Sequence, residues 1–542
     1  MMAPMTQSVD AMLRADGPAL SSALAQRLVA GGLSPEAARQ RVSRGGNGVR
    51  RLSGLIFPKN ARFLYHDDDY LRERYWRHLL RDISTASPAY GPAIGALLAR
   101  GGIVPLEHFE IVSGSPIRQK GQVSSSTVLE RLLAVNLLEM RDVEGIGPCV
   151  AIAAAGHFGA PDVDGLRARL ITEGVLLAAV RDWARRLGMA SYDKIEVRER
   201  GTLPRCGTFN WDLCGPSYLR PLIGRDKAKK TIPGFLVCDA VSGRAVDELA
   251  IAAFLRKCQL SASLRNIPTF LPVLIADHYT REALRSGKAY GVMMATPQTL
   301  LGREVASGLA ALLATLTKAA AVAVQKPEVI GELFSKLSSI EGAGTNLRGA
   351  LFEMIVGNLT QAVEGGSIDI GRRVNFASGD VVFKAELDVM RVTGNKVTIY
   401  ECKGYQPAQI ISAEDVQKWL KEKIPGINTW TKASQLANHQ VSFEYWTTGQ
   451  LAPDARELLE TAAATTKKYA ISYKEGPAVR KYAAELAGSG ILKVLDEHYF
   501  NHPITRFDRR YDVSTRLEEL EIDLDLGEDL IGVGSDDEVL PI

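Results

Sequence analysis

Phe383-Lys-Ala-Glu-Leu-Asp-Val-Met-Arg-Val-Thr-Gly-Asn-Lys-Val-Thr-Ile-Tyr-Glu-Cys-Lys-Gly404 is the stretch that decides the fold. It predicts two strands joined by a turn at Gly394-Asn395. Because side chains alternate between the faces of a strand, Glu386 and Asp388 share one face of the first strand, and Glu401 and Lys403 share one face of the second. A hairpin register can therefore bring Asp388, Glu401 and Lys403 together at one edge of the sheet.

Two carboxylates beside an ammonium group on otherwise apolar strands are costly unless something binds there. We expect a Mg²⁺ site for phosphodiester hydrolysis, with Mn²⁺ as a substitute. Asp388 and Glu401 would each supply a carboxylate, and the backbone carbonyl of Cys402 a third oxygen. Lys403 would orient the attacking water and offset charge in the transition state. Glu353, on the helix upstream, would hold a metal-bound water. The alternative is a surface hairpin with solvated charges.

Glu-Leu-Asp at 386–388, Glu-Cys-Lys at 401–403 and the upstream Glu353 resemble the motif of the PD-(D/E)xK nuclease superfamily. The strand and helix pattern that follows resembles the Mrr-type restriction endonucleases. The resemblance implies a central mixed sheet, Mg²⁺ dependence, DNA cleavage and a role in restriction or antiviral defence. It makes Asp388 and Glu401 metal ligands and Lys403 the catalytic lysine. The chain departs from the motif in two ways, since no Pro precedes the first acid and Cys402 takes a usually apolar position.

The composition is that of a globular protein with several domains. The 542 residues exceed the size of a single core, and the net charge of +3 does not by itself call for nucleic acid. Six cysteines without CxxC spacing predict free thiols in a reducing compartment. The most apolar helix candidate, 308–324, is interrupted by Thr315, Thr317 and Lys318. We therefore expect a cytoplasmic protein without a membrane span. A GxxxxGK(S/T) loop is missing, which argues against a built-in ATPase.

Residues 1–78 are predicted to form a winged helix-turn-helix module, and 79–158 a second, winged-helix-like one. Ser34-Pro35-Glu36 starts the second helix of the first module with an N-cap and a Pro at N1. Basic and amide side chains on that helix and on the following strand could contact phosphates and base edges. The candidate DNA-binding residues are Arg39, Gln40, Arg41, Arg44, Arg50 and Arg51. The alternative is a module that packs on its neighbours or mediates dimerisation.

An order of helix, strands, helix, strand, helix, strand and helix recurs, which predicts an internal duplication. The first copy spans 159–305, a helical connector 306–341, and the second copy 342–500. Glu173, Asp212 and Asp239 would correspond to Glu353, Asp388 and Glu401. Val241 stands where the second copy has Lys403, so we expect the first copy to be degenerate and non-cutting. A lysine from the loop at 227–230 could replace the missing one.

The predicted fold class is thus multidomain α/β (α+β), with winged-helix modules before two restriction-endonuclease-like domains. The predicted function is a Mg²⁺-dependent DNA endonuclease. Two alternatives stay open: a repair or recombination nuclease, and a non-catalytic DNA-binding adaptor. DNA is the expected partner, and a double-strand cut by one active site per chain favours a homodimer. Partner proteins of a defence system would fit the same function. An acidic tail, 501–542, is expected to be solvated or to mimic DNA over a basic groove.

Overall fold

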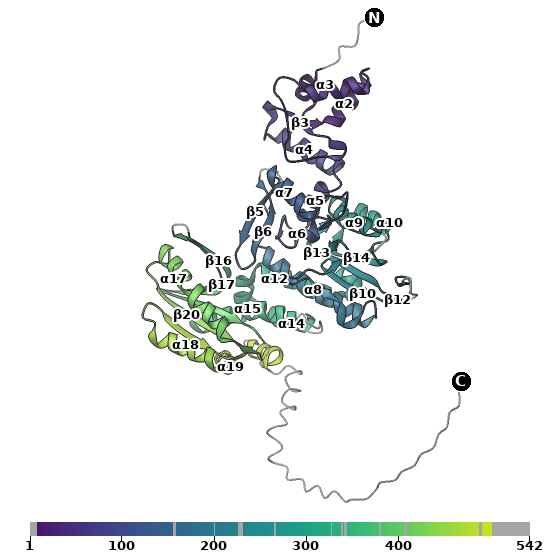
Figure 1. The fold of residues 1–542 in the computed structure, drawn as a ribbon. Helices are drawn as coiled ribbons and strands as arrows, with labels where there is room; N and C mark the ends of the chain where they lie inside the picture. The colour runs from purple at the N-terminus through teal and green to yellow at the C-terminus, as the bar shows by residue number, and fades with distance from the viewer. Residues whose placement is uncertain are drawn as a thin grey trace, which may run out of the picture.

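The computed structural model describes residues 8–154, 159–199, 201–225, 231–264, 267–326, 328–337, 340, 344–378, 381–405, 409–486 and 490–500. The acidic tail and the loop at 227–230 lie outside these residues. Within them the chain is a mixed α/β protein, as predicted (Figure 1). None of the helices in the described part is both long and apolar enough to cross a membrane.

The N-terminal unit combines three helices with a small sheet. Its elements are α1 (Val9–Asp16), α2 (Ser21–Ala30), α3 (Pro35–Arg44), β1 (Ala19–Leu20), β2 (Val49–Arg51) and β3 (Phe63–His66), with strand order β1-β3-β2. The Ser34 hydroxyl accepts the Ala37 N–H, and Pro35 occupies the first turn of α3. The predicted start of this helix is therefore confirmed.

A second small unit follows without a break in the core. It contains α4 (Glu73–Ala86), α5 (Tyr90–Ala99), α7 (Ser125–Ala134), β4 (Ile103–Pro105), β5 (Leu138–Val143) and β6 (Gly147–Ile152), with strand order β4-β6-β5. Helix α4 runs through the boundary that we predicted at residue 78, and one apolar cluster joins Leu20, Tyr75, Leu97 and Ile152. The reason is that Tyr75 and Leu79 of this one helix are buried in the shared core.

The third unit is an α/β layer around a five-stranded sheet of order β7-β10-β13-β14-β15. Its elements are α8 (Leu166–Arg186), β7 (Glu196–Val197), β10 (Leu213–Ser217), β13 (Gly234–Val246), α9 (Glu248–Ala262), β14 (Phe270–Tyr279), α10 (Arg281–Ala289), β15 (Met293–Ala295) and α11 (Pro297–Leu301). The first two neighbouring pairs are antiparallel, and the last two are parallel.

The fourth unit repeats this arrangement with strand order β16-β17-β18-β20-β22 and the same sequence of directions. Its elements are α15 (Gly344–Glu364), β16 (Ser367–Ser378), β17 (Val381–Thr393), β18 (Lys396–Lys403), α16 (Ala413–Lys418), a π-helical turn η5 (Trp419–Lys423), α17 (Ile424–Ala433), β20 (Gln440–Thr447), α18 (Pro453–Thr465), β22 (Ala470–Lys474) and α19 (Gly476–Ala484). Two units with one topology are what a duplication produces. The hairpin turn is where the sequence predicts it, with Gly394 at φ 55.

Three helices connect the two α/β units: α12 (Arg303–Thr317), α13 (Ala319–Gln325) and α14 (Glu328–Leu337). The boundary predicted at residue 305 falls inside α12, because this helix continues without a break. The largest apolar cluster includes Leu176 of α8, Leu312 of α12, Phe334 of α14 and Leu351 of α15. Both units therefore pack on one common core, seen in Figure 1 where α15 lies between the green unit and the teal helices.

Candidate active site

Strand register places the predicted residues at one edge of the second α/β sheet. Antiparallel pairing of β17 with β18 extends to Val389 and Tyr400, and Asp388 and Glu401 follow directly beyond it. The Asp388 Oδ2 atom accepts the Cys402 N–H at 2.7 Å. Parallel pairing with β20 fixes Glu401, Cys402 and Lys403. The structure therefore brings Asp388, Glu401 and Lys403 together.

Two ammonium groups hold Glu401. The Lys403 Nζ lies 2.8 Å from Oε1, and the Lys423 Nζ lies 2.7 Å from Oε1 and 2.8 Å from Oε2. Burial opposes ionisation of Glu401, but Lys403 and Lys423 together lower its pKa below the usual value. Lys423 was not among the predicted residues.

Asp388 has a different environment. It is partly buried and makes no ion pair within 4 Å among the residues that the structure describes. Burial, followed by the charges of Glu401 and Glu353, raises the pKa of Asp388 to about 7. Of the site carboxylates, Asp388 is thus the one whose charge is least compensated by the protein.

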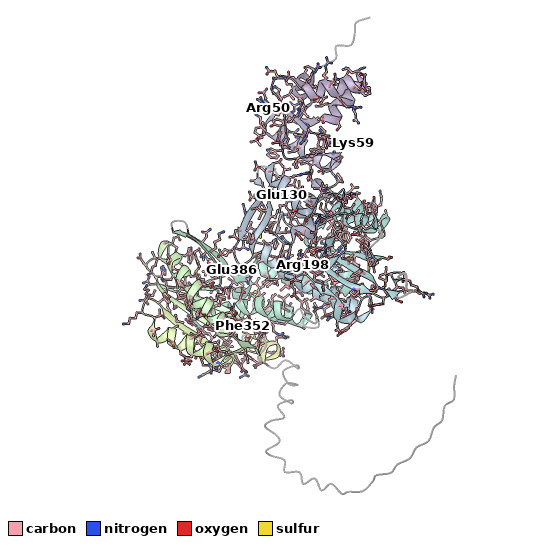
Figure 2. The ribbon with its side chains drawn as sticks, viewed as in Figure 1. Arg50, Lys59, Glu130, Arg198, Phe352 and Glu386 are labelled. Carbon is pink, nitrogen blue, oxygen red and sulfur yellow. The ribbon has the colours of Figure 1, made fainter. Side chains whose placement is uncertain are left out.

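Glu353 and Glu386 are bridged by an arginine from the other α/β unit. The Arg167 guanidinium donates to both Glu353 carboxylate oxygens, at 2.6 and 2.9 Å, and its Nε lies 3.1 Å from Glu386 Oε1. Glu353 thus faces the predicted edge from α15, but its partner is Arg167. Its role as holder of a metal-bound water stays a prediction. In Figure 2 Glu386 lies where the C-terminal unit meets the middle of the molecule.

The β5–β6 turn of the second small unit covers Glu386 from another side. Lys384 on β17 is ion-paired with Asp142, and a Cβ atom added at Gly145 would overlap Glu386 Oε2. Burial and the charge of Glu386 raise the pKa of Glu144 to about 7. The β5–β6 hairpin, more than 200 residues from β17 in sequence, thereby packs against one side of the site.

The donor atoms suit a hard divalent cation, because Asp388, Glu401 and Glu353 offer carboxylate oxygens and the strand offers carbonyls. Within the described part of the chain, however, no three His, Cys, Asp or Glu side chains converge as a ready metal site. In this arrangement Glu401 is paired with Lys403 and Lys423, and Glu353 is paired with Arg167. The Cys402 thiol, with its pKa raised by burial, is protonated and unsuited to coordinate.

The first α/β unit contains the same arrangement of carboxylates. Asp212 Oδ2 accepts the Ala240 N–H at 2.7 Å, just as Asp388 accepts the Cys402 N–H. Asp239 precedes Ala240 as Glu401 precedes Cys402. Position 241 is a buried valine, as the sequence shows, but Lys257 of α9 reaches Asp239 Oδ2 at 2.6 Å. The ammonium that contacts Asp239 therefore comes from the following helix, while the loop at 227–230 lies outside the described residues.

An arginine, Arg198, pairs with the other two carboxylates of the first unit. The Arg198 guanidinium is ion-paired with Glu173 and lies 2.6 Å from Asp212 Oδ1. The Arg198 side chain is 6% exposed, and Lys257 is fully buried. Glu173, Asp212 and Asp239 are all buried, and the non-cutting role of this copy stays a prediction.

The candidate DNA-binding residues of the N-terminal unit lie on two faces. Arg39, Gln40 and Arg44 are exposed on α3, and Arg41 is half-buried. Arg51 donates to the Ser43 carbonyl, whereas Arg50 forms an ion pair with Asp67 at 2.8 Å. Figure 2 shows Arg50 and Lys59 on opposite sides of this unit.

A cleft of about 1080 Å³ lies on the face that contains Lys59. Its cationic lining residues are Arg39, Arg51, Lys59 and Arg62, and none of its described lining residues is acidic. Lys59 and Asn60 adopt left-handed backbone conformations, with φ 59 and φ 58. Lys59 and Arg62 were not predicted, because Lys59 lies in the short 3-10 turn Pro58–Asn60 and Arg62 directly before β3, outside the helix and strand that carry the predicted residues.

Comparison with known proteins adds little to this geometry. No family model and no curated protein matches the chain. Protein VC1899 from Vibrio cholerae aligns over 36% of this chain and 53% of its own length, with 15% identity and a TM-score of 0.19. The match thus spans about half of that protein. Restriction endonuclease FokI aligns over 86% of this chain and 82% of its own, with 10% identity and a TM-score of 0.20. Superpositions this distant do not bear on fold or function.

Proposed function

We propose that the protein is a Mg²⁺-dependent DNA endonuclease whose C-terminal α/β unit cuts phosphodiester bonds. One observation carries the proposal: Asp388, Glu401 and Lys403 meet at a sheet edge, with Asp388 lacking a cationic partner among the described residues. An under-compensated carboxylate beside a lysine is unfavourable unless a cation or a substrate completes the site.

The chain's own residues have separate tasks in this proposal. A bound Mg²⁺, with Mn²⁺ as substitute, would neutralise the phosphate and lower the pKa of a water. Asp388 and Glu401, with the Cys402 carbonyl, supply oxygen ligands. Lys403 orients the water and offsets negative charge that develops on the phosphate. Glu353, once free of Arg167, accepts a hydrogen bond from the hydration shell.

The N-terminal unit would bind DNA through the cationic cleft and α3. Arg39, Arg51, Lys59 and Arg62 line one continuous cleft without acidic neighbours, so phosphates would find four cationic groups there. Gln40 and Arg44 are also exposed on α3, outside the lining of this cleft, and would contact base edges. Arg50 is excluded from the main contact, since Asp67 neutralises it.

The broader role that we propose is restriction of foreign DNA in the cytoplasm, by a homodimer or with partner proteins of a defence system. A second candidate is a non-catalytic DNA-binding adaptor. It is favoured by the ion pairs that hold Glu353, Glu386 and Glu401, because such pairs neutralise carboxylates without a metal.

Plasmid cleavage with Mg²⁺ or with EDTA distinguishes the enzyme from the adaptor. We expect cleavage by the wild type with Mg²⁺ alone, and loss of cleavage in Lys403→Ala and Asp388→Ala with DNA binding retained. An adaptor would bind DNA and leave the plasmid intact under both conditions. Cleavage retained in both variants would refute the site assignment.

A further inference from the structure

We infer that Arg167 is an internal competitor of the divalent cation and keeps the carboxylates of the second α/β unit in a closed, cation-free arrangement. The inference rests on the proposed function, because it concerns the regulation of the same site.

Arg167 occupies Glu353, the carboxylate that the proposed function gives to the hydration shell of the cation, and also the neighbouring Glu386. Its guanidinium lies within 2.6 to 3.1 Å of oxygens of Glu353 and Glu386, and so bridges the helix carboxylate to a strand carboxylate. Paired, charge-assisted hydrogen bonds of this kind are the strong ones in proteins. While they persist, Glu353 is turned to Arg167, and fewer oxygens can converge on a metal.

The first α/β unit contains a similar arginine bridge between two carboxylates, and this bridge is more deeply buried. Arg198 bridges the helix carboxylate Glu173, the counterpart of Glu353, and the strand carboxylate Asp212, the counterpart of Asp388. Arg198 comes from the same unit and is 6% exposed, whereas Arg167 comes from the neighbouring unit and is 29% exposed. The Arg198 guanidinium is thus buried in the first unit, whereas the Arg167 guanidinium at the second site stays partly accessible to solvent.

Arg167 also has space into which it can withdraw. It lines a cavity of about 550 Å³ together with Glu353, Glu386, Arg372 and Arg373. Asp164, exposed at the rim of this cavity, offers a carboxylate outside the site. A rotamer change of one side chain would therefore free Glu353 and Glu386 without separating the two units, whose common core stays packed.

The test is Mn²⁺ titration of the full chain followed by electron paramagnetic resonance, with thermal melting as a second readout. We expect Arg167→Gln to bind Mn²⁺ at least about tenfold more tightly than wild type, since one charge-assisted pair is removed. Arg167→Lys, which keeps the charge but cannot bridge two carboxylates, should lie between them. Arg372→Gln is the matched control, because Arg372 lines the same cavity but pairs with Asp369.

Adding Asp388→Asn to Arg167→Gln should remove the tighter binding. Unchanged or weaker Mn²⁺ affinity in Arg167→Gln overturns the inference, as does tight binding that survives Asp388→Asn. If Arg167→Gln does not fold, the Mn²⁺ affinity of Arg167→Lys relative to wild type decides the question in the same way. Tighter Mn²⁺ binding without DNA cleavage would uphold the inference and refute the nuclease. DNA cleavage by the wild type together with an unchanged Mn²⁺ affinity in Arg167→Gln would refute the inference and support the nuclease.

Discussion

Lys423 lies 2.7 and 2.8 Å from the two carboxylate oxygens of Glu401, although the residues are 22 positions apart. Lys257 reaches Asp239 in the same way from the equivalent helix of the first α/β unit. A lysine on the helix after the third strand is therefore a shared feature of both units. Lys403 is an additional group of the second unit, since the first unit has the buried Val241 at that position.

Replacing Lys423 by Ala should slow DNA cleavage by roughly 10- to 100-fold, because Glu401 keeps Lys403 but loses half of its charge compensation. Single-turnover cleavage under saturating enzyme measures the effect. Lys421→Ala is the control, since Lys421 is exposed two residues away. A rate equal to that of wild type in Lys423→Ala would show that this lysine is only structural.

Replacing Lys257 by Ala should destabilise the protein by about 3 kcal/mol or more, because it leaves Asp239 buried without its cation. Urea unfolding followed by circular dichroism measures the loss. Lys288→Ala, on the surface of α10, should change stability by less than about 0.5 kcal/mol. Equal stability of both variants would contradict a structural role for the first site.

His108 should contribute a loss of stability as the pH drops below 6.5, whereas Asp388 and Glu144, whose pKa values are raised to about 7, contribute in the opposite direction. Burial lowers the pKa of His108 to about 3. At pH 5 this imidazole is therefore protonated in the unfolded chain but neutral in the folded chain. The loss is about 2 kcal/mol between pH 7 and pH 5. In His108→Gln that part of the slope should vanish, as urea midpoints at both pH values would show. His278→Gln, at an exposed position, should retain the slope.

Replacing Gly145 by Ala should lower the melting temperature more than replacing Gly121 by Ala. Both glycines have positive φ, at 72 and 76, so both variants carry a backbone penalty of about 1 kcal/mol. Only the Cβ at position 145 would overlap a side chain, that of Glu386, whereas nothing lies near position 121. Equal melting temperatures would mean that the β5–β6 turn does not press on the site.

Replacing Arg39 or Lys59 by Ala should weaken binding of duplex DNA, and each should reduce the slope of log affinity against log salt by about 1. Fluorescence anisotropy at several salt concentrations measures both quantities. Arg50→Ala should have little effect, because Asp67 already neutralises Arg50. Equal losses of DNA affinity in all three variants would indicate that DNA binds outside this cleft. Tighter binding of RNA than DNA would change the substrate class.

The sequence predicts those parts of the site that are local. Asp388, Glu401 and Lys403 lie on one hairpin, so alternation and a two-residue turn suffice to place them. Lys423, Arg167 and the β5–β6 turn reach the site from other elements, and no periodicity links them to it. Lys257 left one signal that could have been used, since Arg256 and Lys257 directly follow the apolar run from Ala250 to Leu255.

The same limit explains the domain boundaries. Residues 78 and 305 lie in α4 and α12, whose amphipathic patterns continue through the predicted limits. Repeated element order indicated two α/β units, because order is a property of the sequence. How the units share apolar surface depends on tertiary packing.

The common core around α15 restricts how this protein can be dissected or recombined. Leu347, Leu351 and Ile355 of α15 lie in a cluster with side chains of α8, α12 and α14. A fragment that begins at the second α/β unit would expose this face to water and would also lose Arg167. We therefore expect that the second α/β unit cannot be excised and fused to another protein as an independent domain. The first α/β unit and the connecting helices supply the apolar surface that covers α15, so a stable fragment would have to include them.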